Sequence, residues 1–331
     1  MHIAPTRRGR PLDADTTAHE SASRSLDPDG RPHVSRPHEL LLDGNARLYA
    51  ENARRDASAA NPGATSGAGP RFNDRILYVG MNSAVVAGKE QNRREAASLP
   101  AGSVIVGHSE DGAGGPDRVR VGGRVVDLST PEGAVAFASS LELPAWQAER
   151  IADVLLRAAS GSRDELARIA AEWARAERGG SIPSRLVLSG HCSGTGVWDG
   201  AGKEGNLTFE SVQALADVMP AAAAQVEDIM LSACSTGYDE GTRRTSLASW
   251  KEHFPNLKTA WGYSSPSDYH SPTGWHAVAH IAAWQLATAG RKAHLDGPGA
   301  VRAEYEAFGA KPFVASNVAT WSVADGYKRG P

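Results

Sequence analysis

The chain has 331 residues, of which 41% are hydrophobic, and its formal net charge is -3. This composition supports a packed globular core and argues against a membrane protein, because no stretch approaches the ~20 consecutive apolar residues of a spanning helix. The slight negative charge, with Lys and Arg scattered along the chain, argues against nucleic acid as the main partner.

The chain has two cysteines, Cys192 and Cys234, and its first residues show no apolar run of the kind found in secretory signal peptides. Two cysteines do not describe a secreted domain that disulfides hold together, so the sequence favours a reducing cytoplasm. The alternative is a translocated effector whose N-terminal segment serves as an address without being a cleavable signal.

Residues 1–70 are rich in Arg, Ser, Asp, Pro, Gly and His and contain few large apolar residues. The run NPGATSGAGP (61–70) has the composition of a flexible linker. We therefore predict a disordered, low-complexity segment over residues 1–70 and one folded domain over residues 71–331. The first segment is either a dispensable tail or a delivery or docking segment.

From residue 71 onward, short apolar runs alternate with segments of helical periodicity. The runs predict strands over 75–82, 103–112, 185–191, 226–234 and 256–263, a hairpin over 118–129 and a last extended segment over 313–323. Helices are expected near 145–158, from Ser162 with a capping box to Glu165, from Thr208, from Ser271 and near 299–308. Strands that alternate with helices predict an α/β fold with a mainly parallel central sheet flanked by helices.

Two predicted strands each end at a reactive side chain that small residues follow. They are LVLSGHCSG (186–194) with His191 and DIMLSACSTG (228–237) with Cys234. Ligands of parallel α/β sheets bind at the carboxyl ends of the strands, so the two side chains lie close together if the strands are neighbours. An imidazole beside a thiol can take its proton and return it to a leaving amine. The sequence therefore predicts Cys234 as a nucleophile and His191 as its base.

The Gly-His pair and the run Leu-Ser-Ala-Cys-Ser-Thr-Gly resemble the motifs of the caspase-like cysteine peptidases (clan CD) of the CHAT/separase group. The gap of about 40 residues between His191 and Cys234 is similar to the roughly 50 found in caspases. This resemblance implies a caspase-like sandwich and an endopeptidase that cuts a protein or peptide substrate, in bacterial signalling or cell-death defence. It also implies a possible activating partner protein, no cofactor, and an oxyanion hole made by the backbone N–H groups of Cys192 and Cys234.

The family usually has glycine where Cys192 stands, so this chain carries a second thiol beside the predicted site. A disulfide between Cys192 and Cys234 would require their Cα atoms to lie within ~7 Å. A zinc ion shared by His191 and the two cysteines is disfavoured, because the chain lacks the usual ligand spacings.

Two other functions stay open. The first is a catalytically inactive relative that binds a partner through the same fold. The second is an α/β-hydrolase in which GHCSG (190–194) is a nucleophile elbow with Cys192 as nucleophile and Asp268 and His294 as partners. An elbow needs a helix directly after it, and the glycine-rich residues that follow do not predict one.

The candidates for substrate binding follow the predicted strands. Asp199, Glu204 and Asp268 are acids that could pair with a basic substrate side chain, although each could equally be an ordinary solvated loop residue. Trp198 and Trp261 could line an apolar wall or fill the core. His108 follows another strand and is expected at most at the rim of the site.

Overall fold

The computed structural model describes residues 73, 75–81, 104–107, 115–192, 194–198, 206–237, 246–264 and 318–329. All of them belong to one compact unit, Ser58–Pro331. The predicted segment 1–70 and the predicted helices from Ser271 and near 299–308 lie outside the described residues.

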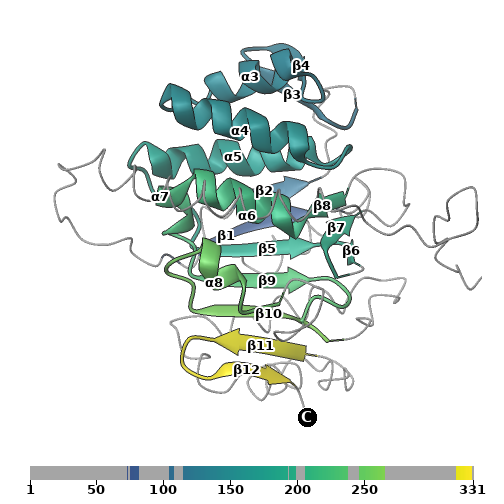
Figure 1. The fold of residues 1–331 in the computed structure, drawn as a ribbon, viewed down its shortest axis with the longest axis vertical. Helices are drawn as coiled ribbons and strands as arrows, with labels where there is room; N and C mark the ends of the chain where they lie inside the picture. The colour runs from purple at the N-terminus through teal and green to yellow at the C-terminus, as the bar shows by residue number, and fades with distance from the viewer. Residues whose placement is uncertain are drawn as a thin grey trace, which may run out of the picture. The chain divides into compact units, whose positions relative to one another are not determined.

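A seven-stranded sheet forms the centre of this unit, with the order β12-β11-β10-β9-β5-β1-β2 (Figure 1). The five strands from β2 to β10 run parallel, and β11 and β12 are antiparallel to their neighbours. This arrangement confirms the predicted α/β class with a mainly parallel sheet. The strands are β1 (Ile76–Gly80), β2 (Val104–Gly107), β5 (Arg185–Ser189), β9 (Asp228–Ser232), β10 (Thr259–Tyr263), β11 (Val318–Ser322) and β12 (Gly326–Arg329).

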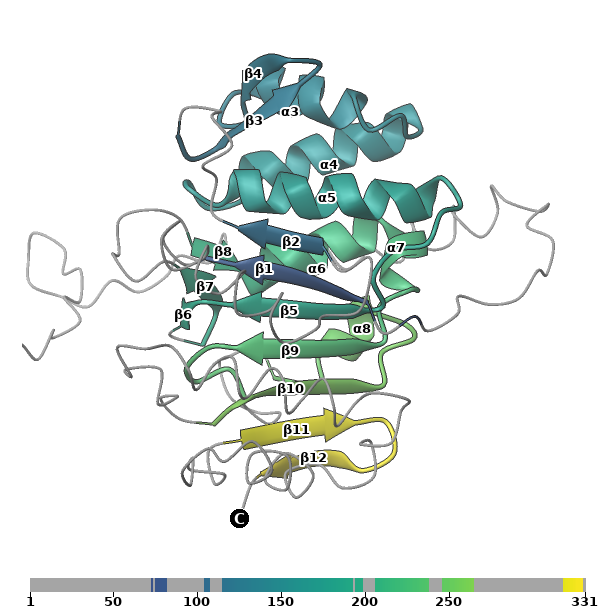
Figure 2. The ribbon, with the colours of Figure 1, turned by 180° about the vertical axis from the view of Figure 1, so that it is seen from behind.

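Helices flank this sheet. Figure 1 shows α6 and α8 in front of the strands, with α5, α4 and α3 stacked beyond the β2 end of the sheet, and Figure 2 shows the strands from the other side. No helix in the described parts of the chain is long and apolar enough to cross a membrane. The helices are α3 (Pro131–Ser139), α4 (Ala145–Arg157), α5 (Arg163–Glu177), α6 (Phe209–Val218), α7 (Pro220–Ala223) and α8 (Trp250–His253).

The four central parallel strands β1, β5, β9 and β10 are buried at all five of their positions. Continuous burial is typical of parallel strands that are covered on both faces. An aromatic cluster then joins three of the helices to one another. Trp173 of α5 packs edge-on against Phe254, which stacks on Trp250 of α8, and Trp250 meets Phe209 of α6.

The structure confirms two predictions that rest on local signals in the sequence. The hairpin β3 (Arg118–Val121) and β4 (Arg124–Asp127) turns at Gly122 and Gly123, both of which have positive φ. Helix α6 begins after Thr208, whose hydroxyl accepts a hydrogen bond from the Ser211 N–H, as expected of an N-cap.

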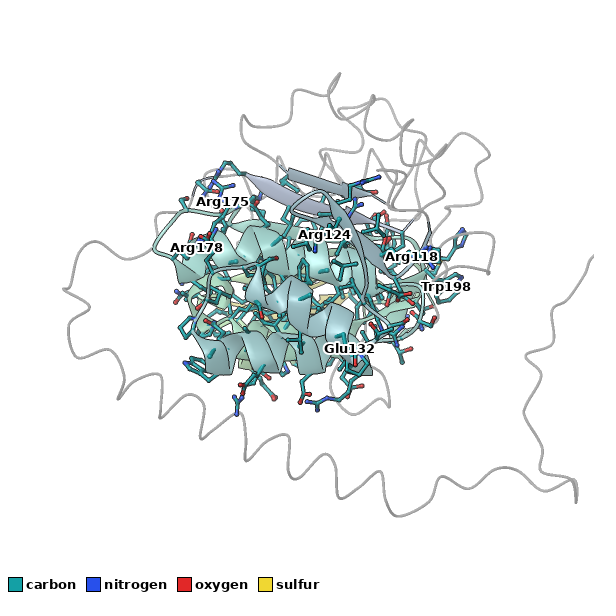
Figure 3. The ribbon with its side chains drawn as sticks, turned by 90° about the horizontal axis from the view of Figure 1, so that it is seen from above. Arg118, Arg124, Glu132, Arg175, Arg178 and Trp198 are labelled. Carbon is teal, nitrogen blue, oxygen red and sulfur yellow. The ribbon has the colours of Figure 1, made fainter. Side chains whose placement is uncertain are left out.

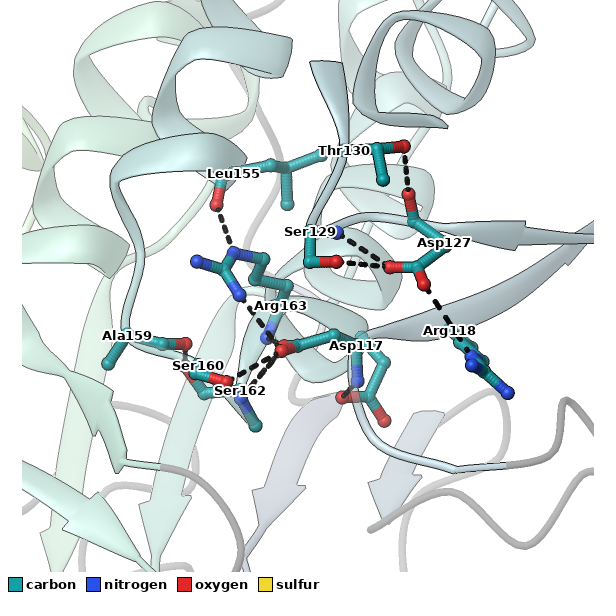
Figure 4. Close-up of polar contacts among 12 residues, drawn as sticks. Asp117, Arg118, Asp127, Ser129, Thr130, Leu155, Ala159, Ser160, Ser162 and Arg163 are labelled. Carbon is teal, nitrogen blue, oxygen red and sulfur yellow. Dashed lines mark hydrogen bonds and ion pairs between the residues drawn. The ribbon is translucent and has the colours of Figure 1, made fainter. Parts of the chain in front are cut away.

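The predicted capping box at the start of α5 is wrong, although the helix does begin after Ser162. The Ser162 hydroxyl donates to the carbonyl of Ala159 and makes no cap hydrogen bond. The carboxylate of Asp117, 46 residues from Arg163 in sequence, takes this place (Figure 4): it accepts from the N–H groups of Gly161 and Arg163 and from the Arg163 guanidinium, 2.8 Å away. A long-range carboxylate therefore satisfies the helix N-terminus.

Asp164, in the first turn of α5, is also buried and makes the stability of the fold depend on pH. Asp164 accepts a hydrogen bond from the Asp117 N–H, and burial, together with the neighbouring Glu165 carboxylate, raises the pKa of Asp164 to about 7. The folded chain therefore keeps a proton on Asp164 at a pH where the unfolded chain has lost it. This contribution to stability is complete below about pH 4 and is lost as the pH rises through about 7.

We expect the variant Asp164→Asn to gain stability relative to the native chain as the pH rises from about 5 to 8, by roughly 2 to 4 kcal/mol. The amide oxygen can still accept from the Asp117 N–H, and the charge that must be buried is gone. Urea unfolding at several pH values measures the difference. Asp153→Asn, at an exposed acid of α4, is the control: its unfolding free energy should differ from that of the native chain by the same amount at every pH. A pH-independent difference for Asp164→Asn as well would contradict the expectation.

Candidate active site

The two candidate catalytic residues follow neighbouring strands at the same edge of the sheet. Strands β5 and β9 pair in parallel, with Ser189 opposite Ser232 at their carboxyl ends. The Gly190 N–H donates to the Ser232 carbonyl over 3.4 Å, which carries the pairing one residue further. His191 and Cys234 each stand two residues beyond this matched serine pair, on strands whose spacing is about 4.8 Å.

The segment that carries Cys234 is tied to β10. Thr236 donates its hydroxyl to the carbonyls of Leu231 and Ala233, and its oxygen accepts from the Tyr263 N–H. The next N–H, of Gly237, donates to the Tyr263 carbonyl over 2.7 Å. These bonds fix the turn on both sides of Cys234, which is itself half-buried.

Gly237 has a steric reason to be glycine. A Cβ atom at this position would lie 2.7 Å from the Cβ of Ala319 on β11 and 3.0 Å from the backbone of Gly262. Its carbonyl also accepts from the Tyr327 hydroxyl of β12. The small residue in the Cys-Ser-Thr-Gly run thus lets the turn lie directly against the neighbouring strands.

His191 belongs to a small three-stranded sheet at the end of β5, made of β6 (His191–Cys192), β7 (Gly196–Trp198) and β8 (Asn206–Thr208). Its two faces differ in burial. The inner row is buried and consists of Cys192, Val197 and Leu207; the outer row is half-buried and consists of His191, Trp198 and Asn206. The sheet therefore anchors itself in the core with one row and presents the imidazole with the other.

Cys192 lies in the buried row and is 8% exposed. Its Sγ accepts a hydrogen bond from the Gly194 N–H over 2.9 Å, inside the turn of the β6–β7 hairpin. Both cysteines are free thiols, so the structure contains no disulfide between Cys192 and Cys234. Cys192 thus packs as a small core residue that also shapes the hairpin.

The nucleophile-elbow alternative is wrong on this geometry. An elbow places its nucleophile at a strand-to-helix turn with the side chain exposed. Here Cys192 is buried, and strand β7 follows it. Helix α6 begins only at Phe209, after β8. Asp268 and His294, the partners this alternative needs, lie outside the described residues.

Trp261 does not line an apolar wall of the site, and this prediction is corrected. It lies in the middle of β10, opposite Met230 on one side and Thr320 on the other, and is 1% exposed. A residue at mid-strand on a central strand packs in the core, whereas the site forms where strands end. Trp198, by contrast, lies in register with His191.

The other predicted substrate-binding acids, Asp199 and Asp268, lie outside the described residues, as do Glu204 and His108. The roles of the Cys192 and Cys234 backbone N–H groups as oxyanion donors stay predictions. Sequence reasoning missed the row formed by Trp198 and Asn206 because strands of two or three residues are too short to show a period.

Comparison with known proteins gives little. No family model matches the chain, and no curated protein matches it. Among solved structures it is similar to the X-ray structure of a secreted C11 cysteine protease from Bacteroides thetaiotaomicron in complex with an irreversible peptide inhibitor, with 10% sequence identity and a TM-score of 0.34, over 76% of this chain and 67% of that chain. A TM-score this low carries no assignment, so the fold class rests on the sheet order and strand directions themselves.

Proposed function

We propose that this chain is a cysteine endopeptidase of the caspase-like CHAT/separase kind, with Cys234 as nucleophile and His191 as its base. The observation that carries the proposal is the parallel register of β5 and β9. It pairs Ser189 with Ser232, and His191 and Cys234 each come two residues after this pair on adjacent strands. In this proposal residues 71–331 form the peptidase domain, and residues 1–70 are a flexible segment.

The proposed chemistry needs only these two side chains and backbone donors. His191 takes the thiol proton, and the Cys234 thiolate attacks the carbonyl carbon of the scissile peptide. The C–N bond then breaks as the imidazolium returns its proton to the leaving amine, which leaves an acyl-enzyme on sulfur. Water, deprotonated by His191, attacks this thioester and releases the acid and the free thiol.

The negative oxygen that develops in each half-reaction needs donors already in place. We assign this role to the backbone N–H groups of Cys192 and Cys234. The turn after β9 supports the role of the Cys234 N–H, because Thr236 and Gly237 fix this turn to Tyr263 of β10 through hydrogen bonds of 3.2 and 2.7 Å. A backbone held by its neighbours loses little entropy when it binds the oxyanion.

The test is covalent labelling with a set of peptidyl acyloxymethyl ketones that differ in the residue next to the reactive group, followed by mass spectrometry of the labelled peptide. The label should fall on Cys234, and His191→Ala should slow it strongly. Cys192 in the same molecule is the internal control. Labelling of Cys192 alone, or of Cys234 at a rate that His191→Ala leaves unchanged, would contradict the proposal and favour a binding module on this fold.

A further inference from the structure

The outer row of the three-stranded sheet places an aromatic side chain beside the candidate base. Trp198 lies directly opposite His191 in the antiparallel register of β6 and β7. The two rings are stacked, with centroids 6.5 Å apart and planes at 29°. Figure 3 shows Trp198 at the opposite end of the described residues from Arg175 and Arg178, which lie at the end of α5.

The position of Trp198 is fixed by close backbone packing. A Cβ atom at Gly190 would lie 2.8 Å from the Trp198 carbonyl oxygen, so only glycine allows β7 to approach the end of β5. On the other side of Trp198, Asn206 of β8 continues the row, and its Oδ1 would lie 2.6 Å from a Cβ atom at Gly196. Trp198 also packs against the hydrophobic core. Gly190 and Gly196 therefore let the backbones of β5, β7 and β8 lie close together, and packing against the core holds the indole.

An indole in this place has two physical effects on an imidazole. Stacking limits rotation of the imidazole about its side-chain bonds, because each turned position loses contact with the indole. The negative face of the indole also attracts a cation. At a centroid separation of 6.5 Å, just beyond the ~6 Å of strong cation–π pairs, this attraction favours the protonated ring weakly over the neutral one. Both effects suit a base that must hold a proton while it faces a thiolate.

We propose that Trp198 is a positioning residue for His191: it orients the imidazole and stabilises its protonated form. This role in catalysis rests on the proposed peptidase function, but the effect of Trp198 on His191 can be measured without any substrate. In an active enzyme, the thiolate–imidazolium pair is lost at high pH when the imidazolium gives up its proton. Trp198 thus extends the working range of the site toward higher pH.

The test is the titration of His191 by NMR in the Cys234→Ala background, which removes the coupled thiol and any cleavage. The His191 resonance is assigned by its loss in His191→Gln. Adding Trp198→Ala should lower the midpoint of the His191 titration by about 0.4 pH unit, which is the lower end of the range for exposed cation–π pairs, because the ring centroids are 6.5 Å apart. Trp198→Phe keeps an aromatic face and should restore most of the shift, and its smaller change guards against loss of folding.

Trp146→Ala is the matched control, because Trp146 is a 47% exposed tryptophan on α4 and should leave the titration unchanged. An identical midpoint in Trp198→Ala and its parent would overturn the proposal, as would a shift that Trp198→Phe fails to restore. The two proposals fail separately. A midpoint shift without labelling of Cys234 would contradict the peptidase function and support the role of Trp198. Labelling of Cys234 without a midpoint shift would support the peptidase function and contradict the role of Trp198.

Discussion

Replacing Cys234 with alanine should abolish peptide cleavage, with a loss of at least about 10³-fold in kcat/KM, because it removes the sulfur that forms the acyl-enzyme in the proposed mechanism. Alanine keeps the Cβ atom of a half-buried residue, so the fold should persist. The measurement is hydrolysis of the peptide sequence that the labelling experiment selects, together with circular dichroism of each variant.

The matched control is the other cysteine. Cys192→Ala removes a buried sulfur from the β6–β7 hairpin and leaves the Gly194 N–H without its acceptor, which should cost about 1 to 3 kcal/mol of stability while cleavage persists. Adding His191→Ala to Cys234→Ala should cost little more, since groups that act as one unit are not additive. Cleavage that survives in Cys234→Ala and disappears in Cys192→Ala would reverse the assignment of the nucleophile.

Replacing Asp117 with alanine should be the most destabilising of these changes, at about 3 to 5 kcal/mol, because it leaves a largely buried guanidinium without its carboxylate. Arg163 and Asp117 are 13% and 9% exposed, and the same carboxylate also accepts from the N–H groups of Gly161 and Arg163 (Figure 4). Urea unfolding at pH 7 measures the loss of unfolding free energy.

The chain supplies a matched control for this change as well. Arg157 and Asp153 form an ion pair of the same 2.8 Å length on α4, but the two side chains are 73% and 65% exposed. Asp153→Ala should change the unfolding free energy by less than about 0.5 kcal/mol, because water solvates both charges when the pair is broken. Equal losses in the two variants would show that the burial of Asp117 does not matter.

Local signals in the sequence predicted the parts of the fold that short-range physics decides. Continuous apolar runs located β1, β5, β9 and β10, and the side-chain cap at Thr208 located the start of α6. Helix α3 was missed although it carries such a signal: Thr130 caps it, and Pro131 occupies its first turn.

The features that sequence reasoning could not predict depend on contacts between distant parts of the chain. Asp117 caps α5 across 46 residues, and β11 pairs antiparallel with β10 although more than fifty residues separate them. The core position of Trp261 follows from its place at the middle of β10, which an apolar run does not specify. The sequence brings His191 and Cys234 together only if β5 and β9 are neighbours, and it does not predict that they are. The structure shows this pairing and the register that aligns Ser189 with Ser232.

The antiparallel β12 has a consequence for how copies of this chain meet one another. Within the described sheet β12 has a single neighbour, β11, and it is partly exposed along its length. Arg329 stands at its end, and the neighbouring Lys328 forms an ion pair of 2.8 Å with Asp325. Cations on an outer strand repel a second copy that approaches to extend the ladder, and natural proteins use them in this way to resist fibril growth. Among the described residues, Arg329 is thus the charge on this outer strand that opposes pairing with the same strand of a second copy.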